Sequence, residues 1–444
     1  MPPPHVVVVG GGLAGLAASV ALADHGIRVC LLEKNPRLGG RATSYRLPSG
    51  EYIDNCQHVT LRCCTNLEDF YRRVGVADKI RYFDHFVFMD AKRRRGTIKP
   101  SRLPAPFHLA PSFVTFPLLG LKDKLSIARA MLHILRSSGN PGLKDSMSML
   151  DRLRGQKQTP AAIDRFWRVV LVSALNEDLE RTDAHYGIMV FWKAFLSSAS
   201  AFGMGVPAVP LADLYASCGE NIEVRTRCTA GEVYITGGRV AGVRLEGGGE
   251  VAGDYYLLAV PFDRLLKIIP ADLRQKEEFA KIANLSVSPI TGAHLWFDRE
   301  IMKEPFLTSV DHTIQWVFNR TGSYVQVVIS ASRGLSNRSQ QEIVDICRRE
   351  LTDLLPEADK AQLTRAVVIR ENAATFSPAP GSDRWRPSQK TSIANLFLAG
   401  DWTQTGWPAT MEGAVRSGYL AAEGILSAAG SCVSLIRPDL RRSE

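Results

Sequence analysis

Short apolar runs alternate with amphipathic stretches along most of the chain, and this alternation predicts a mixed α/β fold. Residues 6–9 are four consecutive valines, which is typical of a strand buried on both faces of a sheet. An alanine-rich stretch at 16–24 predicts a helix, and a second, mostly apolar strand follows at 27–32. A glycine-rich turn lies between the first strand and the helix, so these residues form a strand–turn–helix–strand unit.

The same patterns predict further elements. Apolar residues at helical spacing predict helices at 65–74, 122–136, 161–174, 183–199, 339–355 and 410–426. Alternation and β-branched residues predict a β pair at 43–47 and 51–53, a β meander with glycine turns at 222–258, and strands at 290–297, 314–330, 366–370 and 396–401. We therefore expect a Rossmann-type unit interrupted by a second sheet with its own helices.

The glycine-rich turn has the spacing of a dinucleotide-binding loop. Gly10, Gly12 and Gly15 form G-x-G-x-x-G. The first glycine permits a tight turn, the second lets the backbone approach a pyrophosphate, and the third lets the helix pack closely on the strand. Leu13 and Ala14 begin the helix, whose free N–H groups and positive dipole end attract phosphates.

An acidic residue completes this unit. Glu33 ends the second strand, where a carboxylate accepts hydrogen bonds from a ribose 2′-hydroxyl, and Lys34 follows it. Two alternatives to a dinucleotide site are a glycine-rich turn without a ligand and a membrane-spanning helix at 6–23. The order of strand, turn, helix, strand and acid argues against the first alternative, and the glycine triplet at 10–12 argues against the second.

Polar residues cluster where a later strand ends. Asp54 and His58 lie in this cluster, at a position that tends to line a ligand cleft in α/β folds. A polar strand exit at the protein surface explains the same residues equally well, and both interpretations stay open.

The chain changes character at 103–121, which is apolar, aromatic and interrupted by prolines that exclude a membrane-spanning helix. The helix predicted at 122–136 follows, with Leu125, Ala128, Leu132 and Leu135 on one face. We expect this pair to dock on a membrane or to line the entrance for an apolar substrate. A core helix with its loop is the alternative. The aromatic residues at 186–195 suit either a core or the wall of a hydrophobic tunnel.

Composition and charge narrow the class of protein. The 444 residues carry 54 basic and 45 acidic side chains, a net charge of +9 that suits an anionic membrane surface or substrate. No recognition motif for nucleic acid accompanies the charge, so nucleic-acid binding is not expected. The eight cysteines show no C-x-x-C motif and no metal-ligand spacing, and we expect reduced thiols and no metal site. No charged leader precedes the first strand, so no signal peptide is predicted.

Residues 39–41 extend the dinucleotide unit. Gly39 and Gly40 allow close approach to a ligand, and Arg41 neutralises phosphate charge. This Gly-Gly-Arg after the acid resembles the FAD-binding signature of the flavin amine oxidase and phytoene desaturase superfamily. The Ala-Gly-Asp at 399–401 resembles a second part of the superfamily pattern. The resemblance implies FAD as the cofactor.

The resemblance also implies roles for individual residues. It assigns the pyrophosphate to the glycine loop and the adenosine ribose to the acid after the second strand. It places the main chain of Cys228 at the adenine, Gly400 and Asp401 near the ribityl–phosphate region, and Thr410 and Met411 under the pyrimidine end of the isoalloxazine. The dipole of the helix beginning there would stabilise negative charge on a reduced flavin.

Within that superfamily the chain resembles the bacterial hydroxysqualene dehydroxylases. The likeness rests on residues 54–59, 103–116, 174–176, 209–215 and, above all, 400–415. It implies reductive removal of the hydroxyl group of hydroxysqualene, an isoprenoid, to give squalene for hopanoid synthesis, with hydride from the flavin N5 and an unidentified electron donor. Such chemistry needs an acid near the hydroxyl. His58 is our candidate, with Asp54 orienting it, and a structural histidine is the alternative.

Two other functions stay open. A carotenoid- or phytoene-type desaturase, or a related flavin amine oxidase, would use the same flavin in the oxidative direction. The prenyl-binding GDP-dissociation inhibitors share the fold without catalysis, but they lack the complete FAD motif that this chain carries.

The expected fold class is α/β (α+β). A discontinuous Rossmann-type FAD-binding domain is expected at 1–90, 203–270 and 386–430, an inserted substrate-binding domain of β-sheet and helices at 91–202 and 271–385, and a tail at 431–444. We expect a cytoplasmic protein that is peripheral on the inner face of the membrane. The chain departs from the superfamily pattern at Cys56 and Arg62, where glycines are usual, at Cys228, where valine is usual, and at 215–222, which is short and lacks most of a helix.

Overall fold

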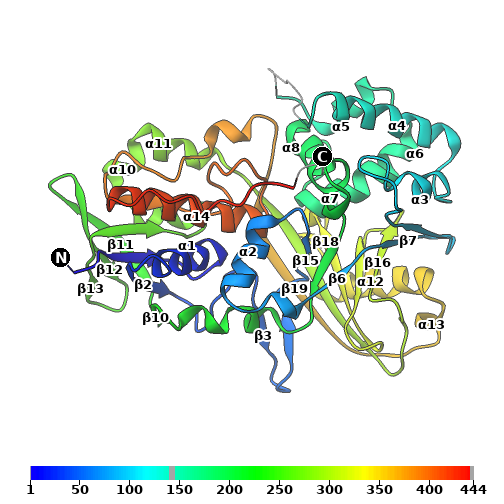
Figure 1. Ribbon diagram of the computed structural model, residues 1–444. Coiled ribbons are helices and arrows are strands. Elements are labelled where there is room, and N and C mark those ends of the chain that lie inside the picture. Colours follow the sequence, from blue (N-terminus) through cyan, green and yellow to red (C-terminus); the bar gives the residue numbers. More distant parts are fainter. Residues whose placement is uncertain (1, 140–145, 441–444) are drawn as a thin grey trace.

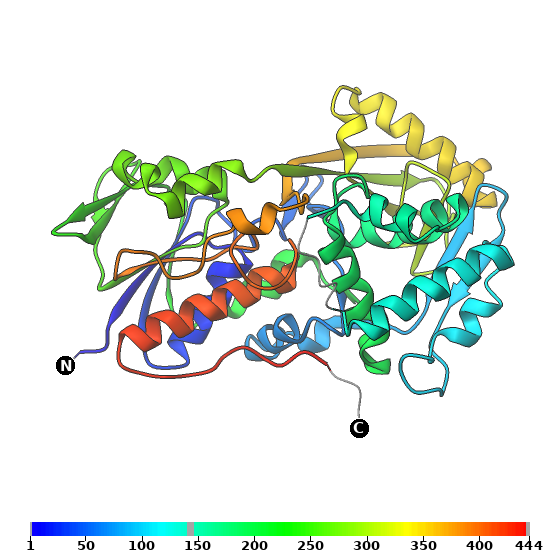
Figure 2. The same ribbon diagram turned by 90° about the horizontal axis from the view of Figure 1, so that it is seen from above.

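The computed structural model describes residues 2–139 and 146–440 and has two sheet-based halves (Figures 1 and 2). In the first half a five-stranded parallel sheet has the order β10–β2–β1–β14–β20. Its strands are β1 (His5–Val9), β2 (Arg28–Glu33), β10 (Glu223–Thr226), β14 (Tyr255–Leu258) and β20 (Leu396–Leu398). Strands from distant parts of the sequence therefore lie side by side in one sheet.

Layers cover both faces of this sheet because its strands are apolar on both faces. On one face Val6 and Val8 pack against α1 (Leu13–Ala23) and α14 (Met411–Ala428), and these two helices contact each other. On the other face Val7 and Val9 pack against a three-stranded sheet of β11 (Ala230–Thr236), β12 (Arg239–Leu245) and β13 (Glu250–Val251), with α9 (Phe262–Ile268) beside it. All four valines are buried, which confirms the strand predicted from them.

The second half is built on a seven-stranded mixed sheet of order β19–β15–β18–β17–β16–β7–β8. Its strands are β7 (Phe86–Asp90), β8 (Arg95–Ile98), β15 (Val287–Phe297), β16 (Phe306–Val310), β17 (Trp316–Asn319), β18 (Tyr324–Ser330) and β19 (Leu363–Phe376). Helix α12 (Gln340–Leu354) packs on one face. On the other side lie α3 (Ala110–Val114), α4 (Leu121–Arg136), α5 (Met149–Gly155), α6 (Pro160–Ala162), α7 (Arg168–Leu175) and α8 (Ala184–Phe191) (Figure 1).

Smaller elements join the halves. The hairpin β3 (Ser44–Arg46)–β4 (Tyr52–Asp54) and the helix α2 (Thr65–Arg73) follow the first βαβ unit. A three-stranded sheet of β5 (Thr60–Leu61), β9 (Met204–Pro207) and β6 (Ile80–Phe83) comes next. The segment after α14 runs back toward the helices of the second half, so its last described residues, which end at 440, lie near the junction (Figures 1 and 2).

Most predicted elements are present, with several corrections. The single helix predicted at 161–174 is α6, a π-helical turn at Ile163–Trp167 and α7. The helix predicted at 183–199 is α8 followed by a second π-helical turn at Trp192–Leu196. The strand predicted at 314–330 is two strands, β17 and β18, and the sequence patterns did not predict β7 and β8. Residues 211–219, part of which was expected to lack helix, form a 3-10 helix that buries Leu214 and Tyr215.

Two sequence-based expectations concern thiols and membranes. All eight cysteines are free, as predicted. Among the described residues, none of the helices combines the length and the apolar character needed to cross a bilayer.

Candidate active site

The glycine loop forms a cradle at the N-terminus of α1. Gly10 has a φ of +110°, and a Cβ added to Gly15 would overlap the carbonyl oxygen of Gly10. At Gly12 the protein atom nearest to an added Cβ is the Cα of Gly40, 3.8 Å away, so the space over this backbone is open. Residues 13–15 occupy the first turn, where N–H groups have no intrahelical acceptor. The cradle is closed toward the sheet and open on the side where a phosphate would lie.

Glu33 lies behind this cradle and is only 5% exposed. Its Oε2 accepts a hydrogen bond from the Gly11 N–H at 2.7 Å, and its Oε1 accepts one from the Asn35 N–H at 2.7 Å. Each carboxylate oxygen keeps a second lone pair, so ribose hydroxyls still have an acceptor here. The exposed Lys34 follows at the rim.

Cys228 follows β10 and lies beside Glu33. Its N–H donates to the main-chain carbonyl of Glu33 at 2.9 Å. That N–H is therefore not free for adenine, and a main-chain contact with adenine would use the Cys228 carbonyl.

Arg41 links the N-terminal glycine loop to Asp401, near the other end of the sequence, through an ion pair. The Gly39 N–H donates to the Gly11 carbonyl at 2.8 Å, which fastens residues 39–41 to the glycine loop. Arg41 Nη2 lies 2.8 Å from Asp401 Oδ1, and its Nη1 donates to the Ala374 carbonyl at 2.5 Å. Burial lowers the pKa of Arg41, but the Asp401 carboxylate more than offsets this and the pKa is raised overall. The structure thus brings together two predicted site residues that lie 360 positions apart.

The start of α14 forms the far side of the site. Thr410 Oγ1 caps the helix by accepting a hydrogen bond from the Gly413 N–H at 3.1 Å, and Met411 is the first helical residue. The Gly400 N–H donates to the Ser417 Oγ at 2.8 Å, which fixes the strand end to this helix. The predicted residues at 400–401 and 410–411 therefore form one local unit.

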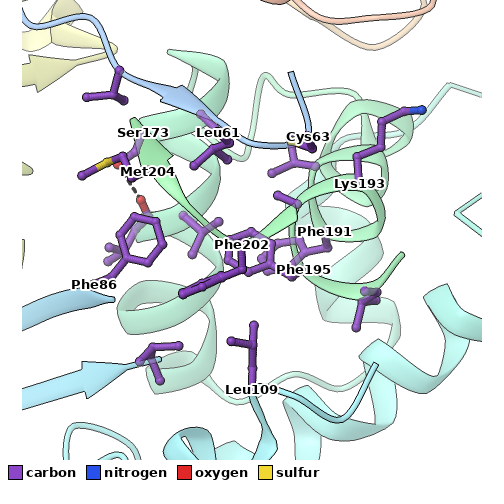
Figure 3. Close-up of a pocket in the computed structure, with 18 of the residues that line it drawn as sticks. Leu61, Cys63, Phe86, Leu109, Ser173, Phe191, Lys193, Phe195, Phe202 and Met204 are labelled. Atoms are coloured by element: carbon purple, nitrogen blue, oxygen red, sulfur yellow. Dashed lines mark hydrogen bonds between the residues drawn. The ribbon is translucent and has the colours of Figure 1, made fainter. Parts of the chain in front are cut away.

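A cavity of about 600 Å³ extends from the start of α14 to the space between the seven-stranded sheet and helices α4, α7 and α8. Thr410 and Met411 line one end of it. Figure 3 shows aromatic side chains gathered at its centre, namely those of Phe86, Phe191, Phe195 and Phe202. Its volume lies within the range of roughly 300–1,000 Å³ that is usual for small-molecule sites. Its walls are mostly apolar, which suits a lipid-like ligand.

The charged side chains on the cavity wall are already paired. Lys193 Nζ lies 2.6 Å from Asp439 Oδ2, and Figure 3 shows its amine turned away from the aromatic centre. The buried Glu412 carboxylate accepts hydrogen bonds from the Leu67 N–H and the Asn66 Nδ2, each at 2.8 Å. Neither charge therefore requires a charged ligand.

The helix predicted at 122–136 contributes to this wall. Ala128, Leu132 and Leu135, three of the four residues predicted on one face, line the cavity. The fourth, Leu125, is 63% exposed. Leu132 and Phe107 both line the cavity and are exposed, so the cavity reaches the surface beside α4.

The structure does not pair the two predicted catalytic residues. The Asp54 carboxylate accepts hydrogen bonds from the Ser44 hydroxyl at 2.7 Å and the Leu211 N–H at 3.0 Å, and Arg320 lies 3.2 Å away. His58 Nδ1 is 3.4 Å from the Cys56 carbonyl. Asp54 therefore orients the hairpin and Arg320, and no hydrogen bond joins it to His58 in the described part of the chain. His58 lies between two cavity-lining residues but does not line the cavity itself.

Cys56 and Arg62 are two departures from the superfamily pattern, and glycine is usual at both positions. Cys56 has a φ of +58°, a conformation that glycine adopts freely and other residues adopt at a cost. Burial raises the pKa of its thiol to about 12, so it stays protonated. Arg62 is exposed and lies over the ring of Tyr82, 4.0 Å from its centroid, outside the cofactor cradle.

Arg386 is a site residue that the sequence did not suggest. It is fully buried, and it donates hydrogen bonds to the main-chain carbonyls of Asp401 and Thr403 and to the Thr405 hydroxyl. An arginine in an irregular, polar stretch gives no pattern that reveals burial.

Comparison with known proteins defines the class as flavin-containing oxidoreductases. The sequence model of the family described as "Flavin containing amine oxidoreductase" matches residues 13–426, so the chain belongs to this family and its cofactor is FAD. The chain is 26% identical over 456 residues to the 15-cis-phytoene desaturase of an Oncidium hybrid cultivar, covering 96% of this chain and 78% of the relative. It is 27% identical over 479 residues to a probable zeta-carotene desaturase of Synechococcus elongatus, covering 96% and 99%.

Solved structures show the same fold. A putrescine oxidase bound to putrescine aligns with a TM-score of 0.73 at 16% identity, covering 96% of this chain and 99% of the other. A cyclohexylamine oxidase from Brevibacterium oxydans aligns with a TM-score of 0.72 at 16% identity, covering 97% and 100%. The predicted α/β FAD-binding fold is therefore confirmed.

Proposed function

We propose that the protein reductively removes the hydroxyl group of hydroxysqualene and gives squalene. The observation that carries this proposal is the apolar cavity that ends at Thr410 and Met411, where the cofactor helix begins. A long isoprenoid suits such walls, and the relatives named for phytoene and zeta-carotene support this class of substrate. The likeness at residues 400–415 supports hydroxysqualene within the class.

The residues present fit FAD. The open cradle at Gly12 and the first turn of α1 would hold the diphosphate. Glu33 would accept the ribose hydroxyls, and Arg41 and Asp401 would lie at the ribityl–phosphate region. The Thr410–Met411 end of α14 would lie under the pyrimidine end of the flavin.

The proposed reaction consumes two electrons and two protons. The carbon–oxygen bond breaks with its electron pair on oxygen, which takes a proton and leaves as water, and a hydride fills the carbon. Reduced FAD supplies that hydride when it is bound. The chain holds the isoprenoid along the aromatic walls and excludes water from the allylic cation, which water would otherwise trap.

Anaerobic incubation with hydroxysqualene tests the proposal. The photoreduced protein is expected to form squalene while its flavin is reoxidised. Failure to form squalene, together with dehydrogenation of phytoene by the oxidised protein, would establish the second candidate, a desaturase, which is favoured by the relatives that match over nearly the whole chain. A purified protein without a flavin spectrum would point to a lipid carrier instead.

We propose His58 as the proton donor, reached between the cavity-lining residues Gln57 and Val59. Burial lowers the pKa of His58, and hydrogen bonding to Cys56 and the charge of Asp54 only partly oppose this. Only the imidazolium donates a proton, so the rate of dehydroxylation should fall as the pH rises through this lowered pKa.

The matching variant is His58→Gln. We expect it to slow single-turnover squalene formation at pH 5.5 by about 100-fold and to flatten the pH profile, while FAD content stays unchanged. An unaltered pH profile in this variant would assign the proton to another group.

We further propose that the surface around α4 contacts a membrane. Six of the nine exposed large apolar residues in the described part of the chain lie here: Leu103, Phe107, Val114, Leu121, Leu125 and Leu132. Lys122 and Arg129 are exposed on the same helix, which suits anionic lipid. Because the cavity opens beside these residues, a substrate could enter it from the bilayer.

A charge placed in this surface should weaken binding. We expect Leu125→Glu to reduce sedimentation with vesicles of phosphatidylcholine and phosphatidylglycerol by about tenfold. The variant removes apolar area that would enter the bilayer, and its carboxylate is repelled by the anionic lipid. Tyr52→Glu is the matched control, since Tyr52 is 49% exposed on the β3–β4 hairpin. Equal losses for both variants would contradict a specific membrane surface.

A further inference from the structure

Residues 377–389 cross from the second half of the molecule to the first. This crossover segment follows β19 and precedes β20, so it connects the seven-stranded sheet to the parallel sheet. It passes alongside α8, the helix whose residues Met189, Val190 and Phe191 line the cavity. The segment therefore touches both the cavity wall and the cofactor-binding half.

Hydrogen bonds fasten the start of α8 to the crossover segment. The Asp183 N–H donates to the Pro378 carbonyl at 2.7 Å, and the Asp183 carboxylate accepts from the Gly381 N–H at 3.0 Å. The Tyr186 hydroxyl donates to Asp383 Oδ1 at 2.8 Å and accepts from Arg386 Nη1 at 2.5 Å. Movement of α8 would consequently act on Arg386 through Tyr186.

Arg386 in turn holds the loop that carries Asp401. Its Nη2 donates to the Asp401 carbonyl at 3.1 Å, to the Thr405 hydroxyl at 3.0 Å and to the Thr403 carbonyl. The side chain is fully buried, and it forms an ion pair with Asp383 at 3.0 Å, whose own side chain is largely exposed. The planar fork of donors suits this task, because it bonds to several acceptors at fixed angles and a lysine cannot reproduce it.

The chain of contacts ends at the cofactor cradle. The Asp401 side chain pairs with Arg41, and Arg41 also bonds to the Ala374 carbonyl at the end of β19. The contacts therefore run from the cavity-lining helix through Tyr186, Arg386 and Asp401 to Arg41.

We propose that Arg386 is a positioning residue that couples the cavity to the cofactor site. A ligand in the cavity fixes α8, and the Tyr186–Arg386 contact then fixes the 400–405 loop that the cofactor meets. Because the first ligand has already restricted the motion of these groups, the second binds with a smaller loss of entropy. Occupancy of the cavity therefore tightens the binding of FAD, and the effect is reciprocal.

The experiment measures FAD release from the holoprotein after dilution, followed by the fluorescence of free FAD, with and without squalene. In the wild-type protein squalene should slow release by about fivefold or more. Tyr186→Phe should release FAD at a rate that squalene no longer slows. Arg386→Lys should release FAD about tenfold faster under both conditions, because it loses hydrogen bonds to the loop.

Arg384→Lys is the matched control, because Arg384 is exposed two positions away, and it should behave as the wild type. The proposal is overturned if squalene does not change release from the wild type, if Tyr186→Phe keeps the full squalene effect, or if Arg386→Lys releases FAD at the wild-type rate. Tyr186→Phe decides the coupling even where Arg386→Lys does not fold. The choice of squalene as the cavity ligand rests on the proposed function, but the readout does not require squalene to form, so loss of catalysis alone does not overturn the coupling.

Discussion

Replacing Gly15 by alanine should abolish stable FAD binding. An added Cβ would overlap the carbonyl oxygen of Gly10 and lie 3.2 Å from the Cβ of Ala259. Both neighbours belong to the central strands or their ends, so neither can move without shifting the sheet. Relief requires α1 to move away from β1, and this displaces the first-turn N–H groups that a diphosphate needs.

We expect FAD affinity to fall by at least about 100-fold, which corresponds to about 3 kcal/mol, the upper part of the usual range for overpacking. The flavin content of the protein after gel filtration measures this loss of FAD affinity. Gly155→Ala is the matched control, because Gly155 ends α5 and an added Cβ meets no atom within 4 Å. Normal flavin content in the Gly15 variant would show that α1 is not held against β1 as the structure has it.

The cofactor half was predictable because its signals are local. The loop from Gly10 to Gly15 and the acid Glu33 lie in one βαβ unit, where a strand, a turn and a helix follow each other in sequence. Their spacing alone fixes which groups meet. The pairing of Arg41 with Asp401 was reachable only through the resemblance, because no local pattern connects residues 360 positions apart.

The substrate half was less predictable because its features are non-local. The cavity is lined by residues from many separate parts of the chain, from Gln57 to Glu412, and their apolar patterns are also those of an ordinary core. Asp54 and His58 are close in sequence, which suggested a pair. The positive φ of Cys56 turns the backbone between them, and Asp54 instead bonds to Ser44 and Arg320. Arg386 was missed because a buried arginine depends on acceptors that are distant in sequence, here up to 200 positions away at Tyr186.

A buried ion pair fixes one wall of the cavity to the sheet. Glu177 follows α7, whose residues Val169, Val170 and Ser173 line the cavity, and its side chain is 0% exposed. Arg333 binds both of its carboxylate oxygens, at 2.5 and 2.8 Å, and also bonds to the Val287 carbonyl. The Ser377 hydroxyl donates to the same carboxylate at 2.5 Å.

Arg333→Met should therefore be strongly destabilising, because among the described residues it leaves the buried Glu177 carboxylate only Arg181, 3.6 Å away, as a counter-charge. The loss is expected to be about 3 kcal/mol. Arg338→Met, which breaks an exposed pair with Glu342, should cost much less, because water screens an exposed ion pair. The melting temperatures of the two FAD-loaded variants, compared with that of the wild type, test this order of stability.

The double variant Glu177→Gln, Arg333→Met separates the charge from the packing. It removes both partners and leaves no buried ion, so it should melt above Arg333→Met alone although it has lost more of the native contacts. The KM for the isoprenoid should rise in Arg333→Met, since α7 is no longer held to the sheet, and should recover in part in the double variant. Melting of the double variant below Arg333→Met would mean that hydrogen bonds to Glu177, rather than its charge, hold this wall of the cavity in place.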